Sequence, residues 1–190
     1  MKVVLLDRKY SEETWEFELE NRDYFDSIDL GRDADYYERV NFQRKFEELL
    51  EEQDQGRCFM HLIFSDDGVL AGRINLADVV RGPFNKAELG YRIGEIHQGK
   101  GYATKATEVV LDMARHRYGL HRIEAGTGKE NIGSQIVLDR NNFRLVGVYE
   151  QFVFQNDFWV DGLLYEKILD RKRNGGTYER TGIVGAGKQP

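Results

Sequence analysis

The most informative stretch of this 190-residue sequence is Gln98-Gly99-Lys100-Gly101-Tyr102-Ala103-Thr104. Residues 87–93, before it, alternate apolar and polar side chains and predict a strand, whereas apolar residues after it recur at helical spacing up to Gly119. The first turn of a helix carries backbone N–H groups without internal partners, and glycines let an anion approach them closely. The stretch therefore predicts a pyrophosphate-binding turn between a strand and a helix.

Two other phosphate-binding loops do not fit this stretch. A Walker A loop requires Ser or Thr after its Gly-Lys pair, but Gly101 follows Lys100. A dinucleotide fingerprint requires a third glycine and a parallel strand, and the strand expected here belongs to an antiparallel series. The sequence leaves open whether Lys100 contacts an anion or is simply solvated.

Outward from this turn, the sequence predicts a mixed chain. Strands are expected at 3–6, 58–64, 69–77, 87–93, 121–125, 143–154 and 158–169, and helices at 11–20, 35–53, 103–118 and 133–141. A loop around Ser27–Gly31 separates the first two helices, and Asp67-Gly68 fits a two-residue hairpin turn. In the second helix an apolar stripe is expected from Tyr36, Val40, Phe46, Leu49 and Leu50. This order predicts an α/β (α+β) fold with a mostly antiparallel central sheet flanked by helices.

The length and composition predict one domain over residues 1–170, followed by a basic, Gly-rich tail over 171–190. The apolar opening of six residues is too short for a signal peptide or a spanning helix, so a cytoplasmic protein with no membrane partner is expected. The single cysteine, Cys58, excludes an internal disulfide and a cysteine-based zinc cage. The four histidines show no metal-ligand spacing, so no metal is expected.

Charge is unevenly distributed along the chain. The formal net charge is −6, yet residues 12–54 contain 16 acidic and 5 basic side chains. Nucleic-acid binding requires clustered cations, so nucleic acid is not an expected partner. The acidic segment suits a cationic ligand, but it is equally compatible with ordinary solvated helix faces.

Several motifs together resemble the GNAT acyltransferase superfamily. Its signature, Gln/Arg-x-x-Gly-x-Gly/Ala, is matched by Gln98, Gly101 and Ala103. Downstream, Asn131-x-x-Ser134 and the segment 142–148 resemble the family block Asn-x-x-Ser followed by Gly-Phe-x-x-x-Gly. The resemblance covers roughly residues 58–169 and is greatest to enzymes that acetylate ribosomal-protein N-termini (RimJ/RimL-like), with polyamine acetyltransferases nearby.

Two positions depart from the family pattern. Asn142 stands where the block has its glycine, and Asn tolerates the left-handed backbone that a glycine would allow. Leu138 stands where many members have a tyrosine that protonates the departing thiolate, so the resemblance does not carry the tyrosine-acid mechanism over to this chain.

The resemblance implies acetyl-CoA as co-substrate and assigns roles by position. The backbone of Ile93 would bind pantetheine, Asn131 would contact the coenzyme arm, and Ser134 would lie near the sulfur as a proton donor. The pyrophosphate would be held by Gln98, Gly99, Lys100, Gly101, Tyr102, Ala103 and Thr104. Glu88 is the candidate general base.

Each catalytic candidate also has a structural interpretation. Ser134 fits a helix cap or first-turn residue, and Glu88 fits an exposed strand carboxylate. Tyr91 is expected to pack or to line the cleft, His97 to be structural, and Trp159 to pack in the core.

The function expected from this resemblance is transfer of an acetyl group to a primary amine of a cationic acceptor, either a protein N-terminus or a small amine. An α-amine has a pKa near 8 and a lysine near 10.4, so an enzyme without a strong base favours an α-amine or a small activated amine. The alternatives are a polyamine- or aminoglycoside-type acetyltransferase and a non-catalytic acyl-CoA-binding domain. A homodimer is left open.

Overall fold

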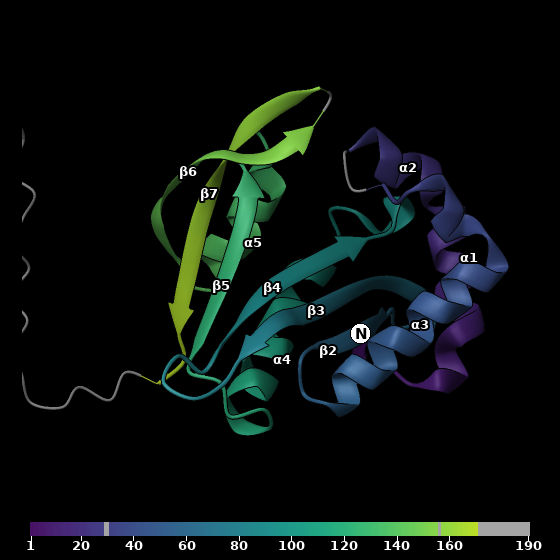
Figure 1. Cartoon of the computed structure of the whole chain (residues 1–190), viewed down its shortest axis with the longest axis horizontal. Helices are drawn as coiled ribbons and strands as arrows, with labels where there is room; N and C mark the ends of the chain where they lie inside the picture. The colour runs from purple at the N-terminus through teal and green to yellow at the C-terminus, as the bar shows by residue number, and fades with distance from the viewer. Residues whose placement is uncertain (29–30, 156, 171–190) are drawn as a thin grey trace, which may run out of the picture.

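Figure 1 shows the computed structural model, which describes residues 1–28, 31–155 and 157–170. The tail expected at 171–190 lies outside the described residues. The helices are α1 (Ser11–Glu20), α2 (Arg22–Ser27), α3 (Arg39–Asp54), α4 (Tyr102–His116) and α5 (Ile132–Arg140), with short 3-10 turns η1 (Arg8–Tyr10), η2 (Ala34–Tyr37) and η3 (Glu95–His97). The strands are β1 (Lys2–Leu5), β2 (Phe59–Phe64), β3 (Leu70–Val80), β4 (Lys86–Ile93), β5 (Arg122–Gly128), β6 (Arg144–Gln155) and β7 (Phe158–Ile168).

The strands form one seven-stranded sheet in the order β1-β2-β3-β4-β5-β7-β6. Every neighbouring pair is antiparallel except β4 and β5, which are parallel. The prediction of a mixed, mostly antiparallel sheet is therefore confirmed. In Figure 1 β4 and β5 start side by side and then diverge, so the two halves of the sheet form a V.

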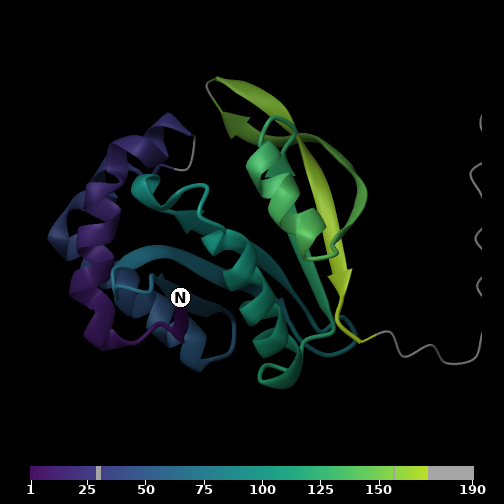
Figure 2. The ribbon, with the colours of Figure 1, turned by 180° about the vertical axis from the view of Figure 1, so that it is seen from behind.

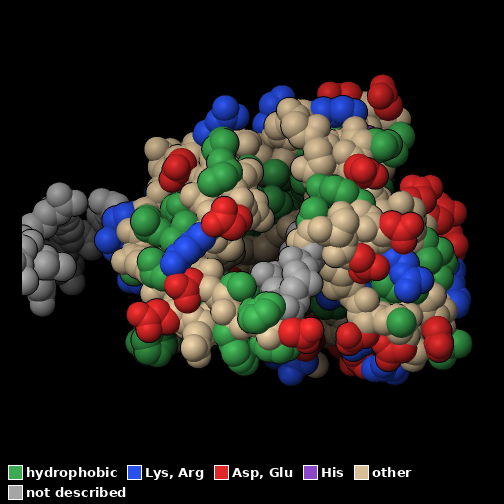
Figure 3. Space-filling view, turned by 90° about the horizontal axis from the view of Figure 1, so that it is seen from above, with side chains coloured by type: hydrophobic (Ala, Val, Ile, Leu, Met, Phe, Trp, Pro, Cys, Tyr) green, Lys and Arg blue, Asp and Glu red, His purple; other side chains and the backbone are tan. Residues whose placement is uncertain are grey.

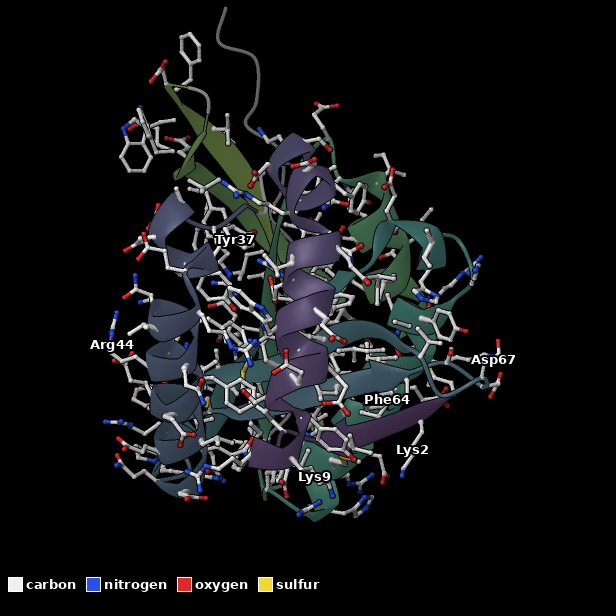
Figure 4. The ribbon with its side chains drawn as sticks, turned by 90° about the vertical axis from the view of Figure 1, so that its right-hand side faces the viewer. Lys2, Lys9, Tyr37, Arg44, Phe64 and Asp67 are labelled. Atoms are coloured by element: carbon white, nitrogen blue, oxygen red, sulfur yellow. The ribbon has the colours of Figure 1, made fainter. Side chains whose placement is uncertain are left out.

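Helices cover both faces of the sheet. Seen from behind, α4 covers the β3–β4 half and α5 the β5–β7 half (Figure 2). Their side of the core contains Ile74, Val110 and Ile123, each fully buried. On the opposite face, α1 and α3 enclose a second cluster that includes Phe42 and Leu62, and Tyr37 lies between α1 and the upper end of α3 (Figure 4). None of the helices in the described part of the chain is long and apolar enough to span a membrane.

The N-terminal helical region differs from its prediction. No helix was predicted between residue 20 and the loop around Ser27–Gly31, but this segment forms α2, a six-residue helix. Its Phe25 is completely buried against Phe17, with ring centroids 5.9 Å apart. A helix this short has no apolar periodicity to detect and depends on that contact. In α3, Val40 is 79% exposed and Phe42 is buried in its place, so the predicted stripe was wrong at Val40.

The predictions of a two-residue hairpin turn and of a buried Trp159 were also wrong. The hydrogen bond from Ser65 N–H to the Val69 carbonyl, at 2.8 Å, closes a loop of three residues, Asp66–Gly68, rather than two. Gly68 has φ 79°, as a three-residue loop with a left-handed last position requires. Trp159 is 59% exposed near the β6–β7 tip, and its ring lies 5.4 Å from that of Phe154. By contrast, Asn142 has φ 58°, which confirms the left-handed conformation expected there.

Candidate active site

The V between β4 and β5 is the structural basis of the site. Lys86–Glu88 lie beside Arg122–Glu124, and beyond these residues the two strands share no pairing in the described chain. β4 continues along β3, and β5 continues along β7 as far as Gly128. The inner edge of β4 therefore presents backbone groups to an opening rather than to a strand.

The backbone of Ile93 lies on this inner edge. Gly94 N–H donates to the Ala71 carbonyl at 2.9 Å, which makes the neighbouring pair Gly72–Ile93 a non-hydrogen-bonded one. The N–H and carbonyl of Ile93 consequently point away from β3. Gln98 Nε2 donates to that carbonyl at 2.7 Å and so links the end of β4 to the turn before α4.

A cavity of about 280 Å³ lies in this opening, between β4, α2, the start of α4 and α5. Figure 3, which looks down from above, shows the hollow between the two halves of the molecule. Of the predicted site residues, those lining the cavity are Ile93, Gln98, Gly99, Gly101, Tyr102, Ala103, Thr104, Asn131 and Ser134. Glu88 and Lys100 do not line it. The fold thus brings nine of the predicted positions to one place.

The turn before α4 has the geometry of an anion-binding site. Gly99 and Gly101 have φ of 71° and 80°, and a Cβ added to either would meet nothing within 4 Å. The first internal bond of α4 runs from Lys105 N–H to the Gly101 carbonyl at 3.1 Å. The amides of Tyr102 through Thr104 therefore have no partner within the helix, and the open glycines leave room in front of them.

The start of α5 forms the opposite wall of the cavity. Asn131 caps this helix, because its Oδ1 accepts from Ser134 N–H at 3.0 Å. Ser134 is thus held in the first turn with its side chain at the cavity. The capping role considered for Ser134 belongs to Asn131, and the Ser134 hydroxyl remains available for other contacts.

Tyr91 joins the two walls. Its hydroxyl donates to Ser134 Oγ at 3.0 Å, across the opening from β4 to α5. Burial raises the pKa of the Tyr91 phenol, and the Ser134 hydrogen bond acts in the opposite direction as the smaller effect. The phenol is therefore protonated at neutral pH and acts as a hydrogen-bond donor.

Glu88 lies on the other face of β4. Alternation along the strand turns it away from Leu89 and Tyr91, and it lies three positions before Tyr91, about 10 Å along β4. Burial raises the pKa of its carboxyl, and Asp78 and Glu124 raise it further, while Lys86 lowers it. Glu88 is an exposed residue outside the cavity lining, which agrees with its interpretation as an exposed strand carboxylate. As a proton acceptor it would need water to connect it with the site.

The charged side chains that line the cavity are cationic. Its lining includes Arg92 and Arg140, and no Asp or Glu occurs among the lining side chains in the described ranges. His97 is buried next to the turn, with its ring 5.7 Å from that of Tyr102, and burial followed by the charge of Lys100 lowers its pKa. Within residues 1–28, 31–155 and 157–170, no group of three His, Cys, Asp or Glu side chains is arranged to hold a metal ion.

Sequence reasoning missed part of this site. Tyr24 and Phe25 line it from α2, the helix that was not predicted, and Arg92 and Arg140 contribute the cations. Alternation placed Tyr91 on the correct face but carried no information on its partner, since Ser134 is 43 residues away.

The chain is similar to known acetyltransferases. A family model described as an acetyltransferase (GNAT) domain matches residues 12–144. The probable N-acetyltransferase YjcK of Bacillus subtilis (strain 168) is 37% identical over 155 residues, which cover 80% of this chain and 84% of the relative. The ribosomal protein uS5-alanine N-acetyltransferase of Escherichia coli (strain K12) is 29% identical over 146 residues, 76% of this chain and 75% of the relative.

Solved structures show the same fold. The ribosomal-protein-S5-alanine acetyltransferase from Vibrio fischeri superposes with a TM-score of 0.82 at 23% identity, covering 90% of this chain and 94% of that chain. Mycobacterium smegmatis RimJ in complex with CoA-disulfide has a TM-score of 0.76 at 25% identity, with coverage of 87% and 80%. With a family model over most of its length and a relative of 37% identity, the chain belongs to the GNAT family of acetyltransferases.

Proposed function

We propose that this acetyltransferase takes its acetyl group from acetyl-CoA and gives it to the α-amine of a polypeptide N-terminus. The observation that carries the proposal is the single cavity that connects the glycine turn before α4 with Ser134 at the opening between β4 and β5. One end of this cavity suits a phosphate-bearing coenzyme, and the other end provides the polar side chains that acyl transfer needs.

The residues present fit coenzyme A. The amides of Tyr102 through Thr104 would bind the pyrophosphate, with Gly99 and Gly101 leaving the space for it. The outward-facing backbone of Ile93 would bind the amide-containing arm in the manner of an added strand. Gln98 would keep the turn against β4, and Lys100, which is exposed, would add charge from outside.

The proposed chemistry divides between two residues. Glu88 would accept the proton of the attacking amine through water, from the face of β4 opposite Ser134. Ser134 would supply a proton to the sulfur that leaves. Positioning both reactants in one site supplies much of the rate, and a correctly placed proton donor or acceptor contributes typically 10²–10⁴-fold.

The acceptor is assigned by charge and by pKa. About one in ten α-amines is neutral at pH 7, against fewer than one in a thousand lysine amines. A polyamine carries several ammonium groups that need carboxylate partners, and the described lining of the cavity has none. Two relatives are named as ribosomal-protein acetyltransferases, one for alanine and one for serine, which supports a protein N-terminus.

The test is thiol release from acetyl-CoA with a panel of amines. Peptides beginning with Ala, Ser or Met are compared with the same peptides blocked at the N-terminus, with spermidine and with an aminoglycoside. We expect thiol release that depends on a free peptide N-terminus, with the acetyl group located there by mass spectrometry. A preference for spermidine or the aminoglycoside would overturn the assignment of the acceptor, and no amine-dependent release would overturn the whole proposal.

A further inference from the structure

The contact between Tyr91 and Ser134 is a hydroxyl pair that links two elements at the cavity. The Tyr91 hydroxyl donates to Ser134 Oγ at 3.0 Å, and both residues line the cavity. Because Oγ accepts from the phenol on one side, the hydrogen of the Ser134 hydroxyl is left to point elsewhere, toward a group in the cavity. Ser134 N–H donates to Asn131 Oδ1 at 3.0 Å, so the backbone of Ser134 is held by Asn131 while its side chain is held by Tyr91.

No tyrosine of α5 can do this work. Leu138 is 2% exposed and packs in the core, so this part of the helix offers no proton donor. The phenol that reaches this region comes instead from β4, on the opposite wall of the opening. Its position depends on the V, because a β5 strand paired along the whole of β4 would occupy the space that the two hydroxyls share.

We infer that Tyr91 and Ser134 act together in protonating the leaving thiolate, with Ser134 as the residue that touches the sulfur and Tyr91 as the positioning residue behind it. This inference rests on the proposed function. The amine nitrogen forms a bond to the acetyl carbon, the C–S bond breaks, and the sulfur keeps its electron pair. Sulfur takes the Ser134 hydroxyl proton, and Oγ takes the Tyr91 proton. The Tyr91 phenolate regains a proton from solvent, into which Glu88 releases the proton that it accepted from the amine.

Acidity explains why two hydroxyls work better than one. A serine hydroxyl is a much weaker acid than a thiol, so it gives up a proton to a thiolate only when its own oxygen is reprotonated at once. A phenol has a reference pKa near 10 and a thiol near 8.5. Burial raises the pKa of the Tyr91 phenol above that reference, but a phenol is still a far stronger acid than a serine hydroxyl, so it brings the proton affinities of the two ends of the relay closer together. Tyr91 thus lowers the barrier without contacting the substrate itself.

The experiment compares Tyr91→Phe, Ser134→Ala and the double variant, using the peptide that the wild type prefers. We expect kcat to fall about 10²-fold in each single variant and by little more in the double variant, because residues that act as one unit give non-additive losses. The affinity for acetyl-CoA, measured by calorimetry, should stay within about twofold. Tyr165→Phe is the matched control: it removes the hydroxyl of a buried tyrosine that does not line the cavity, and should keep the wild-type kcat.

A second substrate separates proton donation from packing. The acetyl thioester of 4-nitrothiophenol releases a thiolate that needs no proton, so the deficit of Tyr91→Phe in kcat/KM should largely disappear with it. An unchanged kcat in Tyr91→Phe, losses that multiply in the double variant, or an equal deficit with both thioesters would each overturn the inference while leaving the proposed function intact. A wild type that shows no amine-dependent release from acetyl-CoA would instead overturn the proposed function and this pair with it.

Discussion

Gly101 combines a backbone conformation that favours glycine with open space for a ligand. It directly precedes α4 with φ 80°, and nothing lies within 4 Å of the place where a side chain would start. Gly119 has the same features, with φ 61° and an equally empty surrounding, but it follows the end of α4 outside the cavity lining. Substitutions at the two glycines therefore distinguish two effects: the strain of an L-residue at positive φ, which both positions share, and the loss of space for a ligand, which applies to Gly101 alone.

We expect Gly101→Ala and Gly119→Ala to destabilise the protein similarly, by about 1 kcal/mol each, because an L-residue is strained in the left-handed region. Only Gly101→Ala should weaken acetyl-CoA binding, by about tenfold or more, since its methyl group takes the space in front of the α4 amides. The bulkier Gly101→Val should abolish binding while the fold persists. Calorimetry and chemical denaturation measure both quantities. Equal affinities of the two alanine variants for acetyl-CoA would show that the pyrophosphate does not bind at this turn.

His61 makes the stability of the fold depend on pH. It is 1% exposed on β2, its Nε2 lies 2.8 Å from the Tyr118 hydroxyl, and burial lowers its pKa from 6.5 to about 4. A lowered pKa in the folded state means that the unfolded chain binds the proton more tightly between these values. The stabilisation is therefore complete above pH 6.5 and is lost as the pH falls toward 4.

The expected loss from this residue is about 3 kcal/mol between pH 7 and pH 4, from a pKa difference of about 2.5. Denaturation at a series of pH values measures it, with His61→Gln as the reference that cannot titrate. The two proteins should differ in pH slope by up to one proton between pH 4 and 6.5. If the free energies of unfolding of the two proteins changed in parallel with pH, the pKa of His61 would not be lowered in the folded protein.

At the scale of elements, one buried acid ties the N-terminal helices to the strand that forms the site. Glu18 of α1 is completely buried, forms an ion pair with Arg73 of β3, and accepts from Arg92 of β4 at 3.0 Å. Arg92 in turn lies over the Phe25 ring of α2, 4.6 Å from its centroid. This network holds α1 and α2 against the cavity end of β4.

We expect Glu18→Gln to cost about 3–5 kcal/mol of stability, because it leaves the buried Arg73 without its countercharge. It should also raise the KM for the acceptor, since Arg92 and α2 line the cavity. Glu12→Gln, on the same helix, breaks an exposed pair with Arg39 and should leave the free energy of unfolding nearly unchanged. Equal stabilities of the two variants would show that the buried network contributes little.

At the scale of the whole molecule, the acidic segment lies beside the cavity rather than inside it. Many acidic side chains lie on the side formed by α1–α3, and others lie on the opposite half of the molecule (Figure 3). Several are paired on the surface, such as Glu48 with Arg44 at 2.7 Å, and Arg44 points outward from α3 (Figure 4). Their effect on a ligand would be through the long-range field, which is screened beyond about 8 Å at physiological salt.

If that field captures a cationic acceptor, kcat/KM should fall steeply with added salt while kcat at saturation changes little. Replacing Asp33 and Asp35 with lysine should reproduce the effect of high salt at low ionic strength. The matched control replaces Glu51 and Asp54, at the far end of α3, with the same change in net charge. Identical salt curves for all three proteins would assign the acids to solvation of the helices alone.

The sequence by itself determined the strand–turn–helix around Gly101, the order of the long elements, and the family. These features depend on neighbours in the chain: alternation, helical spacing and the backbone freedom of glycine act over a few residues. For the same reason nine of the predicted site positions line one cavity, because they belong to the end of β4, the turn before α4, the first residues of α4 and the start of α5.

Tertiary structure alone decided which partners these positions meet. α2 exists because Phe25 packs against Phe17, Ser134 meets Tyr91 because β4 and β5 separate after three residues, and Trp159 is exposed because it lies near the tip of a hairpin. Each of these depends on contacts between segments far apart in the chain. Local patterns carry no information on such contacts, since their free energy comes from burial and pairing that form only in the folded sheet.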